Sequence, residues 1–81
     1  KMEQIYDRLN KLFKDFFDDD TIEIDENTTA GEIEDWDSLN HITLIDTVES
    51  EFGLKFTMGE VSGMKNVGEM ARIIKERGKR I

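Results

Sequence analysis

The sequence predicts an all-α fold, a small four-helix bundle with three main helices, one short helix and a long loop between the first two helices. Three observations carry this prediction. Apolar residues recur at helical spacing in three separate segments. Glycines or cap-forming residues mark the ends of these segments, and the chain contains no proline. With 81 residues and no cysteine, the chain is expected to form one domain, residues 1–81, held by a single apolar core.

The first helix is expected to run from about Met2 to Phe17. Its apolar stripe consists of Ile5, Leu9, Leu12, Phe13 and Phe16. The run Asp18-Asp19-Asp20 ends this pattern. A loop then extends to about Asp37, with three spaced apolar residues that should anchor it to the core, Ile22, Ile24 and Ile33. Because a loop of this length in a small domain usually serves a function, we expect it to be part of a functional site.

The alternation of apolar residues around Glu23 is compatible with a short strand, but the chain offers no obvious partner strand.

The second helix should begin at Ser38, with Asp37 as its N-cap, and continue to about Phe52. Gly53 is suited to the left-handed cap that ends it. Its broad apolar face comprises Leu39, Ile42, Leu44, Ile45, Val48 and Phe52.

A short third helix is expected from Thr57 to Ser62, weakened by Gly59. Asn66 should cap the fourth helix, which runs to about Arg77 and ends at Gly78. The inward face of this helix is predicted to consist of Val67, Met70, Ala71, Ile73 and Ile74. The methionines at 58, 64 and 70 are interpreted as core fillers that would also suit a deformable pocket. The last three residues are expected to be frayed.

The net charge of −8 is unevenly distributed. From Asp15 to Leu54 there are fourteen acidic residues and no lysine or arginine. This acidic belt should repel nucleic acid and anionic membranes and attract proteins with basic patches, although a merely solvated loop would look the same. No stretch approaches the roughly 20 apolar residues that span a bilayer, and the first residues lack the apolar segment of a secretory signal. We therefore expect a cytoplasmic protein without membrane insertion, and a monomer.

Ser38 lies where the acidic loop meets the second helix, in the segment Asp35-Trp36-Asp37-Ser38-Leu39. A phosphodiester on its oxygen would lie near free N–H groups, at the positive end of the helix dipole. Nothing nearby clearly activates the hydroxyl as a nucleophile. His41, one turn further on, is interpreted as a surface polar residue, and a hydrolytic Ser38–His41 pair lacks a third group. No catalytic residue is predicted.

The triplet Asp37-Ser38-Leu39, followed by the apolar face of the second helix, resembles the attachment motif of the acyl carrier protein family. The resemblance covers nearly the whole chain, including Glu49-Ser50-Glu51-Phe52 at the end of the second helix and Val67 at the start of the fourth. The triplet alone is common, but its place at a helix start in a small acidic helical domain is specific. The segment Trp36-Asp37-Ser38-Leu39-Asn40-His41 is more similar to free-standing carriers of specialised pathways than to the housekeeping fatty-acid carrier.

The resemblance implies that a phosphopantetheinyl transferase, using Mg²⁺ and coenzyme A, attaches a 4′-phosphopantetheine arm to Ser38. In that reaction the Ser38 hydroxyl attacks the pyrophosphate of coenzyme A, and the arm becomes a phosphodiester. The thiol of the arm then holds an acyl group as a thioester, which explains thiol chemistry in a chain without cysteine. The implied protein is a carrier rather than an enzyme, and it presents acyl intermediates to enzymes of fatty-acid, polyketide or related specialised lipid biosynthesis.

By the same resemblance, Asp37 helps the transferase to recognise the site, and Leu39 inserts into an apolar depression on partner enzymes. Ile42 contributes to the partner surface or to the mouth of an acyl pocket. The partner-binding residues implied for acyl-loading and acyl-processing enzymes with basic patches are Trp36, Leu39, Ile42, Asp46 and Glu49. Trp36 has a second interpretation, as a cover for the core, and His41 would also be placed to reach the phosphate of the arm.

Two departures from the family pattern favour a specialised acyl or polyketide pathway over bulk fatty-acid synthesis. Asp46 stands where many fatty-acid carriers have an apolar residue that contacts partners. Thr43 and Ser50 stand where glutamates are common, and the third helix is less acidic than usual. Docking to the basic patches of the usual fatty-acid synthesis enzymes should therefore be weaker.

Two alternatives stay open. An aminoacyl or aryl carrier of a peptide-synthetase system would use the same arm, whereas an unmodified acidic adaptor would bind a basic partner through the acidic belt. The carboxylates that begin at Asp18 do not make an EF-hand, because Glu23 occupies the sixth position, where glycine is required. Only weak, nonspecific binding of divalent ions is expected there, and no metal site is predicted.

Overall fold

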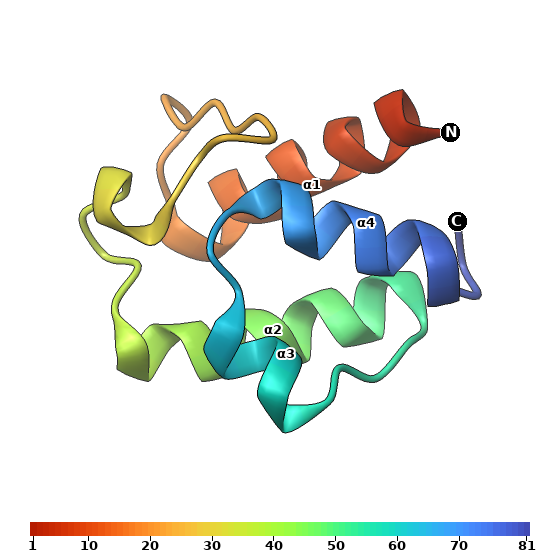
Figure 1. The fold of residues 1–81 in the computed structure, drawn as a ribbon. Helices are drawn as coiled ribbons and strands as arrows, with labels where there is room; N and C mark the ends of the chain where they lie inside the picture. Colours follow the sequence, from red (N-terminus) through yellow and green to blue (C-terminus); the bar gives the residue numbers. More distant parts are fainter.

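The computed structural model describes residues 1–81 and contains only helices joined by loops. The elements are α1 (Met2–Phe17), the short 3₁₀ helix η1 (Ala30–Glu32), α2 (Ser38–Phe52), α3 (Met58–Gly63) and α4 (Val67–Arg77). Figure 1 shows α1, α2 and α4 gathered around one centre, and α3 lies in the connection from α2 to α4. The predicted all-α bundle is confirmed. The possible strand around Glu23 is not formed, because the segment pairs with no other extended segment.

The helices begin and end at residues with the predicted capping chemistry. The side chains of Asp37 and Asn66 each accept a hydrogen bond from the backbone N–H three residues further on, at 2.8 and 2.9 Å. Gly53 ends α2 with φ of 71°, a left-handed conformation that a residue without Cβ adopts readily. The third helix starts at Met58, one residue later than predicted, because Thr57 serves as its N-cap.

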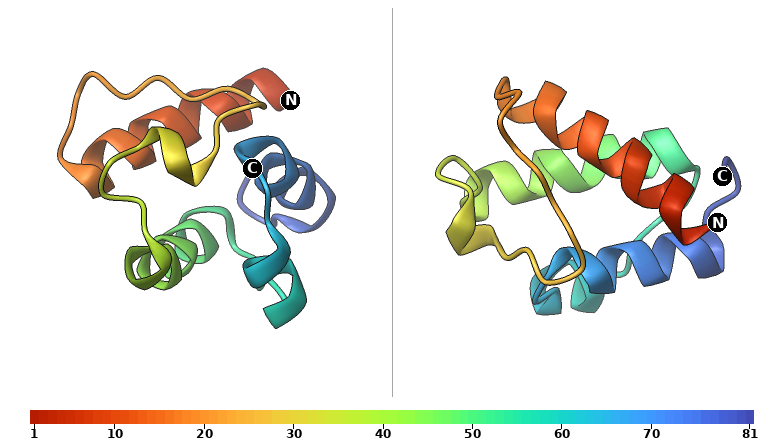
Figure 2. Two further views of the ribbon diagram at one scale, coloured as in Figure 1. Left: turned by 60° about the vertical axis from the view of Figure 1, so that its left-hand side comes forward. Right: turned by 90° about the horizontal axis from the view of Figure 1, so that it is seen from above.

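Seventeen buried apolar residues form the core. The largest fully buried side chains come from α1, α2 and α4 and include Phe13, Phe52, Ile5, Leu9, Leu44, Met70 and Ile74. Figure 2 shows these three helices enclosing the core from three sides. Removal of this apolar surface from water is the main contribution to stability in a domain of this size. None of the helices has the length and apolar character needed to cross a membrane.

Three apolar residues are exposed: Leu39 and Ile42, which were expected on the apolar face of α2 and also in contact with partners, and Met58, whose interpretation as a core filler is wrong. Leu39, Ile42 and Met58 expose 80%, 56% and 88% of their surface. At roughly 100° per residue, Leu39 and Ile42 lie on a different side of α2 from the buried stripe of Leu44, Ile45, Val48 and Phe52. The single apolar face predicted for α2 is therefore two stripes, of which only one is buried. Met64 and Ile73 are half-buried at the edge of the core.

The long loop is held by hydrogen bonds as well as by apolar anchors. Asn10 on α1 accepts a hydrogen bond from the backbone N–H of Ile24 at 2.7 Å and donates one to its carbonyl at 3.3 Å. The backbone N–H of Val67, at the start of α4, donates to the carbonyl of Thr28 at 2.9 Å. The three predicted anchors are buried or half-buried: Ile22, Ile24 and Ile33. The loop is thus fixed to both α1 and α4 before it reaches Ser38.

The C-terminal residues are bound to the body of the protein, so the predicted fraying of this tail is wrong. The backbone N–H groups of Lys79 and Arg80 both donate to the carbonyl of Phe52 at 2.9 Å. The Arg80 guanidinium donates to the carbonyl of Ser50, and Arg8 on α1 donates to the carbonyl of Arg80, each at 2.7 Å. This arrangement brings the two termini to the same end of the bundle (Figures 1 and 2).

Candidate functional site

Ser38 is the first residue of α2 and its side chain is exposed. The preceding backbone is held by two contacts of Asn40, whose N–H donates to the Asp37 side chain and whose amide donates to the carbonyl of Asp35, both at 2.8 Å. The backbone N–H groups of Ser38 and Leu39 have no acceptor within the protein. The serine oxygen therefore lies at a rigid helix start with two free N–H groups, where an anionic group is stabilised.

A groove of about 420 Å³ opens beside Ser38, between the start of α2 and the segment from α3 to α4. Its apolar lining consists of Ala30, Trp36, Ile42, Val61 and Met64. Lys65 is the only lysine or arginine that lines it. The groove thus combines an apolar wall with one cation and the Ser38 side chain in the same lining, and its volume is in the range of small-molecule sites, about 300–1,000 Å³.

Trp36 belongs to the core rather than to the partner surface. It is 6% exposed, and its ring meets Phe13 edge to face with centroids 5.3 Å apart. Its indole N–H donates to His41 Nδ1 at 3.0 Å. Of the two interpretations of Trp36, the structure supports the cover for the core, and the assignment of Trp36 as a partner-binding residue is wrong.

His41 is half-buried and hydrogen-bonded through both ring nitrogens, so its predicted surface role is also wrong. Nδ1 accepts from Trp36, and Nε2 lies 2.9 Å from the carbonyl oxygen of Val61 on α3. His41 falls on the buried stripe of α2, one turn before Leu44 and Ile45. Because both nitrogens are engaged, the imidazole has no free lone pair with which to activate the Ser38 hydroxyl.

The other residues expected to contact partners divide into two groups. Leu39, Ile42 and Asp46 are exposed on α2 and free to meet another protein. Glu49 is turned inward: its side chain is 12% exposed and accepts a hydrogen bond from the backbone N–H of Phe56 at 2.8 Å. Glu49 therefore fixes the link between α2 and α3, which removes it from the partner surface.

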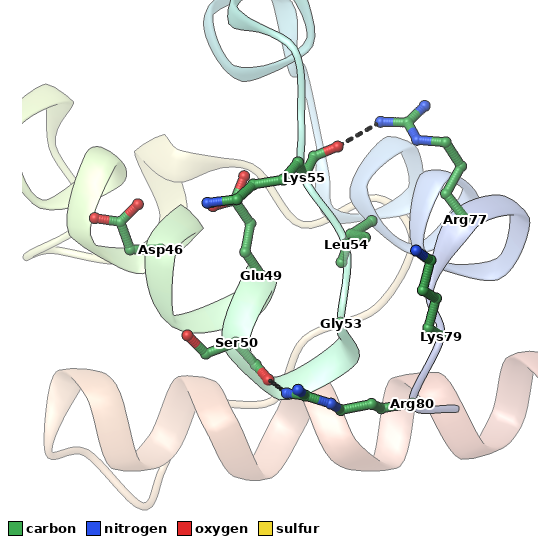
Figure 3. Close-up of a pocket in the computed structure, with 9 residues that line it drawn as sticks. All are labelled: Asp46, Glu49, Ser50, Gly53, Leu54, Lys55, Arg77, Lys79 and Arg80. Carbon is green, nitrogen blue, oxygen red and sulfur yellow. Dashed lines mark hydrogen bonds and ion pairs between the residues drawn. The ribbon is translucent and has the colours of Figure 1, made fainter.

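A second hollow, of about 750 Å³, lies at the far end of α2 and is unsuited to an apolar cargo (Figure 3). Leu54 is the one hydrophobic residue in its lining. Its arginines are already engaged, since Arg77 donates to the carbonyl of Lys55 and Arg80 to that of Ser50. This hollow lies where the C-terminal residues bind back to the end of α2.

An ion pair joins α3 to α4 on the side of the groove formed by α3. Both oxygens of Glu60 accept from the Arg77 guanidinium, at 2.6 and 2.9 Å. The hydrogen bonds from Arg77, and then that from the Thr57 N–H, lower the pKa of Glu60 to about 2. The structure contains no cluster of three histidine, cysteine or carboxylate side chains arranged to hold a metal ion.

Several residues that shape the site were not predicted from the sequence. The pattern Thr57-x-x-Glu60 is a capping-box signal that would have placed the start of α3. The position of His41 on the buried stripe of α2 was a signal that it points inward. The role of Val61 has no signal in the sequence, because it is the backbone carbonyl that makes the contact.

Comparisons with known proteins agree on one family. A family model described as the phosphopantetheine attachment site matches residues 7–74. The acyl carrier protein of Lactobacillus acidophilus is 33% identical over 73 residues, which cover 90% of this chain and 91% of that protein. The solution NMR structure of a holo acyl carrier protein from Geobacter metallireducens superimposes with a TM-score of 0.83 at 39% identity, covering 89% of this chain and 83% of that one.

Proposed function

Because this chain belongs to the acyl carrier protein family, we propose that Ser38 is the residue to which its 4′-phosphopantetheine is attached. Members of this family are carriers rather than enzymes, and the cofactor is held covalently. The observation that carries the assignment is the position of Ser38: an exposed hydroxyl at the start of a helix, within the triplet Asp37-Ser38-Leu39 and beside an apolar groove.

The residues around Ser38 fit a phosphodiester. The free N–H groups of Ser38 and Leu39 lie at the positive end of the α2 dipole. Lys65 lines the same groove and is the nearest source of positive charge in its lining. When attached, the cofactor supplies a thiol that carries acyl groups as thioesters. Ser38 would hold the phosphodiester through its oxygen, and Lys65 would partly offset the negative charge.

The groove beside Ser38 is the part of the protein best suited to shelter an apolar cargo. Trp36, Ile42, Val61 and Met64 provide apolar surface in the same lining as Ser38. Met64 is unbranched and half-buried, so it can adapt to chains of different shape.

The partners of an acyl carrier are a phosphopantetheinyl transferase and acyl-processing enzymes. We propose that they contact the exposed stripe of Leu39 and Ile42 on α2, with Asp46 one turn after Ile42. Exposed apolar residues that share one side of the molecule often mark such a contact. The acidic charge around the stripe would direct it to basic patches.

We further propose that the carrier serves a specialised acyl or polyketide pathway in the cytoplasm. Asp46 is an exposed carboxylate within the surface offered to partners, and Thr43 next to it carries no charge. With Glu49 turned inward, this part of α2 offers less negative charge than the sequence suggested. Weaker attraction to strongly basic docking patches follows.

The attachment site is tested by incubating the apo protein with coenzyme A and a promiscuous phosphopantetheinyl transferase, followed by intact mass measurement. We expect one added phosphopantetheine in the wild type and in Ser50→Ala, an exposed serine at the other end of α2, and none in Ser38→Ala. Unmodified wild-type protein, or modification that persists in Ser38→Ala, would contradict the assignment. Unmodified protein would favour the acidic adaptor, and an aminoacyl or aryl group on protein purified from its own cells would favour the peptide-synthetase carrier.

A further inference from the structure

His41 makes the only hydrogen bond that joins α2 to α3. Its Nε2 lies 2.9 Å from the carbonyl oxygen of Val61, while the other contact in this region, between Glu49 and Phe56, holds the link between the two helices. α3 is six residues long and has no buried residue. α3 is otherwise held by the half-buried side chain of Val61 and by the ion pair between Glu60 and Arg77 on α4. The position of α3 relative to α2 thus depends strongly on His41.

The hydrogen-bond partners determine which nitrogen of His41 carries the proton. The indole nitrogen of Trp36 is only a donor, so Nδ1 of His41 must be the acceptor at 3.0 Å. The carbonyl of Val61 is only an acceptor, so Nε2 must donate. These two hydrogen bonds together form a bridge from Trp36 through His41 to Val61. The bridge requires the neutral imidazole with its proton on Nε2. Trp36, which is fixed in the core, selects this form and sets the plane of the ring.

The bridge crosses the groove beside Ser38. Trp36, His41 and Val61 all line that groove. The hydrogen bond between His41 and Val61 joins the wall formed by α2 to the wall formed by α3, and the bond from Trp36 fixes His41 to the loop before α2. Any widening of the groove by movement of α3 away from α2 must lengthen or break the bond between His41 and Val61. One hydrogen bond to a half-buried carbonyl is strong enough to hold a short helix and weak enough to be broken by a cargo.

We propose that His41 is a positioning residue that acts as a latch between α2 and α3 and sets how far the groove beside Ser38 can open. The latch would limit the size of the acyl chain that the groove shelters. The role in cargo size rests on the proposed function, whereas the latch itself is a property of the protein before any arm is attached. The two parts are therefore tested separately.

The latch is tested on the apo protein with two variants that separate the two ring nitrogens. In His41→Asn, the amide oxygen takes the position of Nδ1 and can still accept from Trp36, but the side chain is too short to reach Val61. In His41→Gln, the amide reaches Val61 but lacks an acceptor at the position of Nδ1. Thr43→Asn, on the exposed side of α2, is the matched control.

We expect backbone amides of α3 to exchange with solvent about tenfold faster in His41→Asn, with the indole N–H of Trp36 still protected. In His41→Gln we expect the reverse, with α3 close to wild type and the indole N–H exchanging faster. Thr43→Asn should match the wild type. The latch is refuted if α3 exchanges at the wild-type rate in His41→Asn. It is also refuted if exchange rises equally in α1 and α4, which would indicate only a general loss of stability.

The effect on the groove is tested with hexanoyl and dodecanoyl thioesters loaded from the corresponding coenzyme A derivatives, and the rate at which hydroxylamine cleaves each. A sheltered thioester is cleaved more slowly. We expect the ratio of dodecanoyl to hexanoyl cleavage rates to fall about threefold in His41→Asn and to stay unchanged in Thr43→Asn. Equal ratios in all proteins would overturn the role in cargo size. Failure of every protein to accept an arm would instead contradict the proposed function, and the exchange measurement would still decide the latch.

Discussion

Gly68 lies in the first turn of α4, where the long loop crosses it. Its N–H donates to the carbonyl of Glu26 at 3.0 Å, and a Cβ added at Gly68 would approach that same oxygen to 2.8 Å. The residue is therefore required for close approach of two backbones, a role distinct from the left-handed conformation that selects Gly53.

Gly68→Ala is expected to lower the free energy of unfolding by about 1–3 kcal/mol, because the loop must move away from α4 to admit the methyl group. Gly59→Ala is the matched control, since nothing lies within 4 Å of the position of its Cβ. This control should be neutral or stabilising by up to about 1 kcal/mol, as expected for alanine in a helix. Urea unfolding of both variants measures the difference, and equal stabilities would contradict the close approach.

At the scale of single elements, α3 is the least firmly held helix. It has one capping box, one ion pair to α4 and one hydrogen bond to α2. Local opening is expected to begin in such a segment, because few apolar contacts oppose it. The groove beside Ser38 therefore has one firm wall, α2, and one wall that can move.

The ion pair between Glu60 and Arg77 makes the attachment of α3 depend on pH. The pKa of Glu60 is lowered from an ordinary value of 4.5 to about 2, so the folded state favours the ionised form. The contribution to stability is complete above about pH 4.5 and is lost as the pH falls toward 2. Amide exchange of α3, referenced to α1, should accelerate over this window. In Glu60→Gln the acceleration should be present already at neutral pH and vary little with acidification, and an unchanged profile would contradict the assignment.

The helices of this protein were predictable because their signals are local. The apolar stripe of α1, the caps Asp37 and Asn66 and the terminal Gly53 all act within a few residues in the chain. The errors concern contacts between distant segments. The inward turn of Glu49, the bridge from His41 to Val61 and the binding of the C-terminal tail depend on packing between elements, which a periodicity within one segment does not report.

The candidate site was predictable to a similar degree. The placement of Ser38 at the start of a helix followed from Asp37 as N-cap, and the structure has this arrangement. The division of α2 into a buried and an exposed stripe did not follow, because leucine and isoleucine occupy both. Which stripe turns inward depends on packing against other elements, as where His41, on the buried stripe, stacks on the ring of Trp36 with centroids 5.9 Å apart.

At the scale of the whole molecule, fourteen of the nineteen acidic residues lie between Asp15 and Leu54, and all eleven lysines and arginines lie outside this segment. Within this belt the only ion pairs reach outward, to Arg8, Lys14 and Lys55. Most of its carboxylates therefore repel one another without nearby compensation, and this repulsion destabilises the compact state.

Thermal unfolding is expected to shift to higher temperature as sodium chloride is raised from about 0.02 to about 0.2 M, because the Debye length then shortens severalfold. Mg²⁺ at matched ionic strength should have an equal or modestly larger effect, since no three carboxylates form a defined metal site. A midpoint that rises with neither ion would show that repulsion within the belt is unimportant.

The hydrogen bonds of Lys79 and Arg80 to Phe52 have a practical consequence for handling this protein. They bring the two chain ends together, at the opposite end of the bundle from the start of α2 (Figure 1). A fluorescent protein or a solid support joined at either end would therefore stand clear of Ser38. A short peptide joining both ends would allow the chain to be reopened at an exposed loop, giving a circular permutant with the same groove.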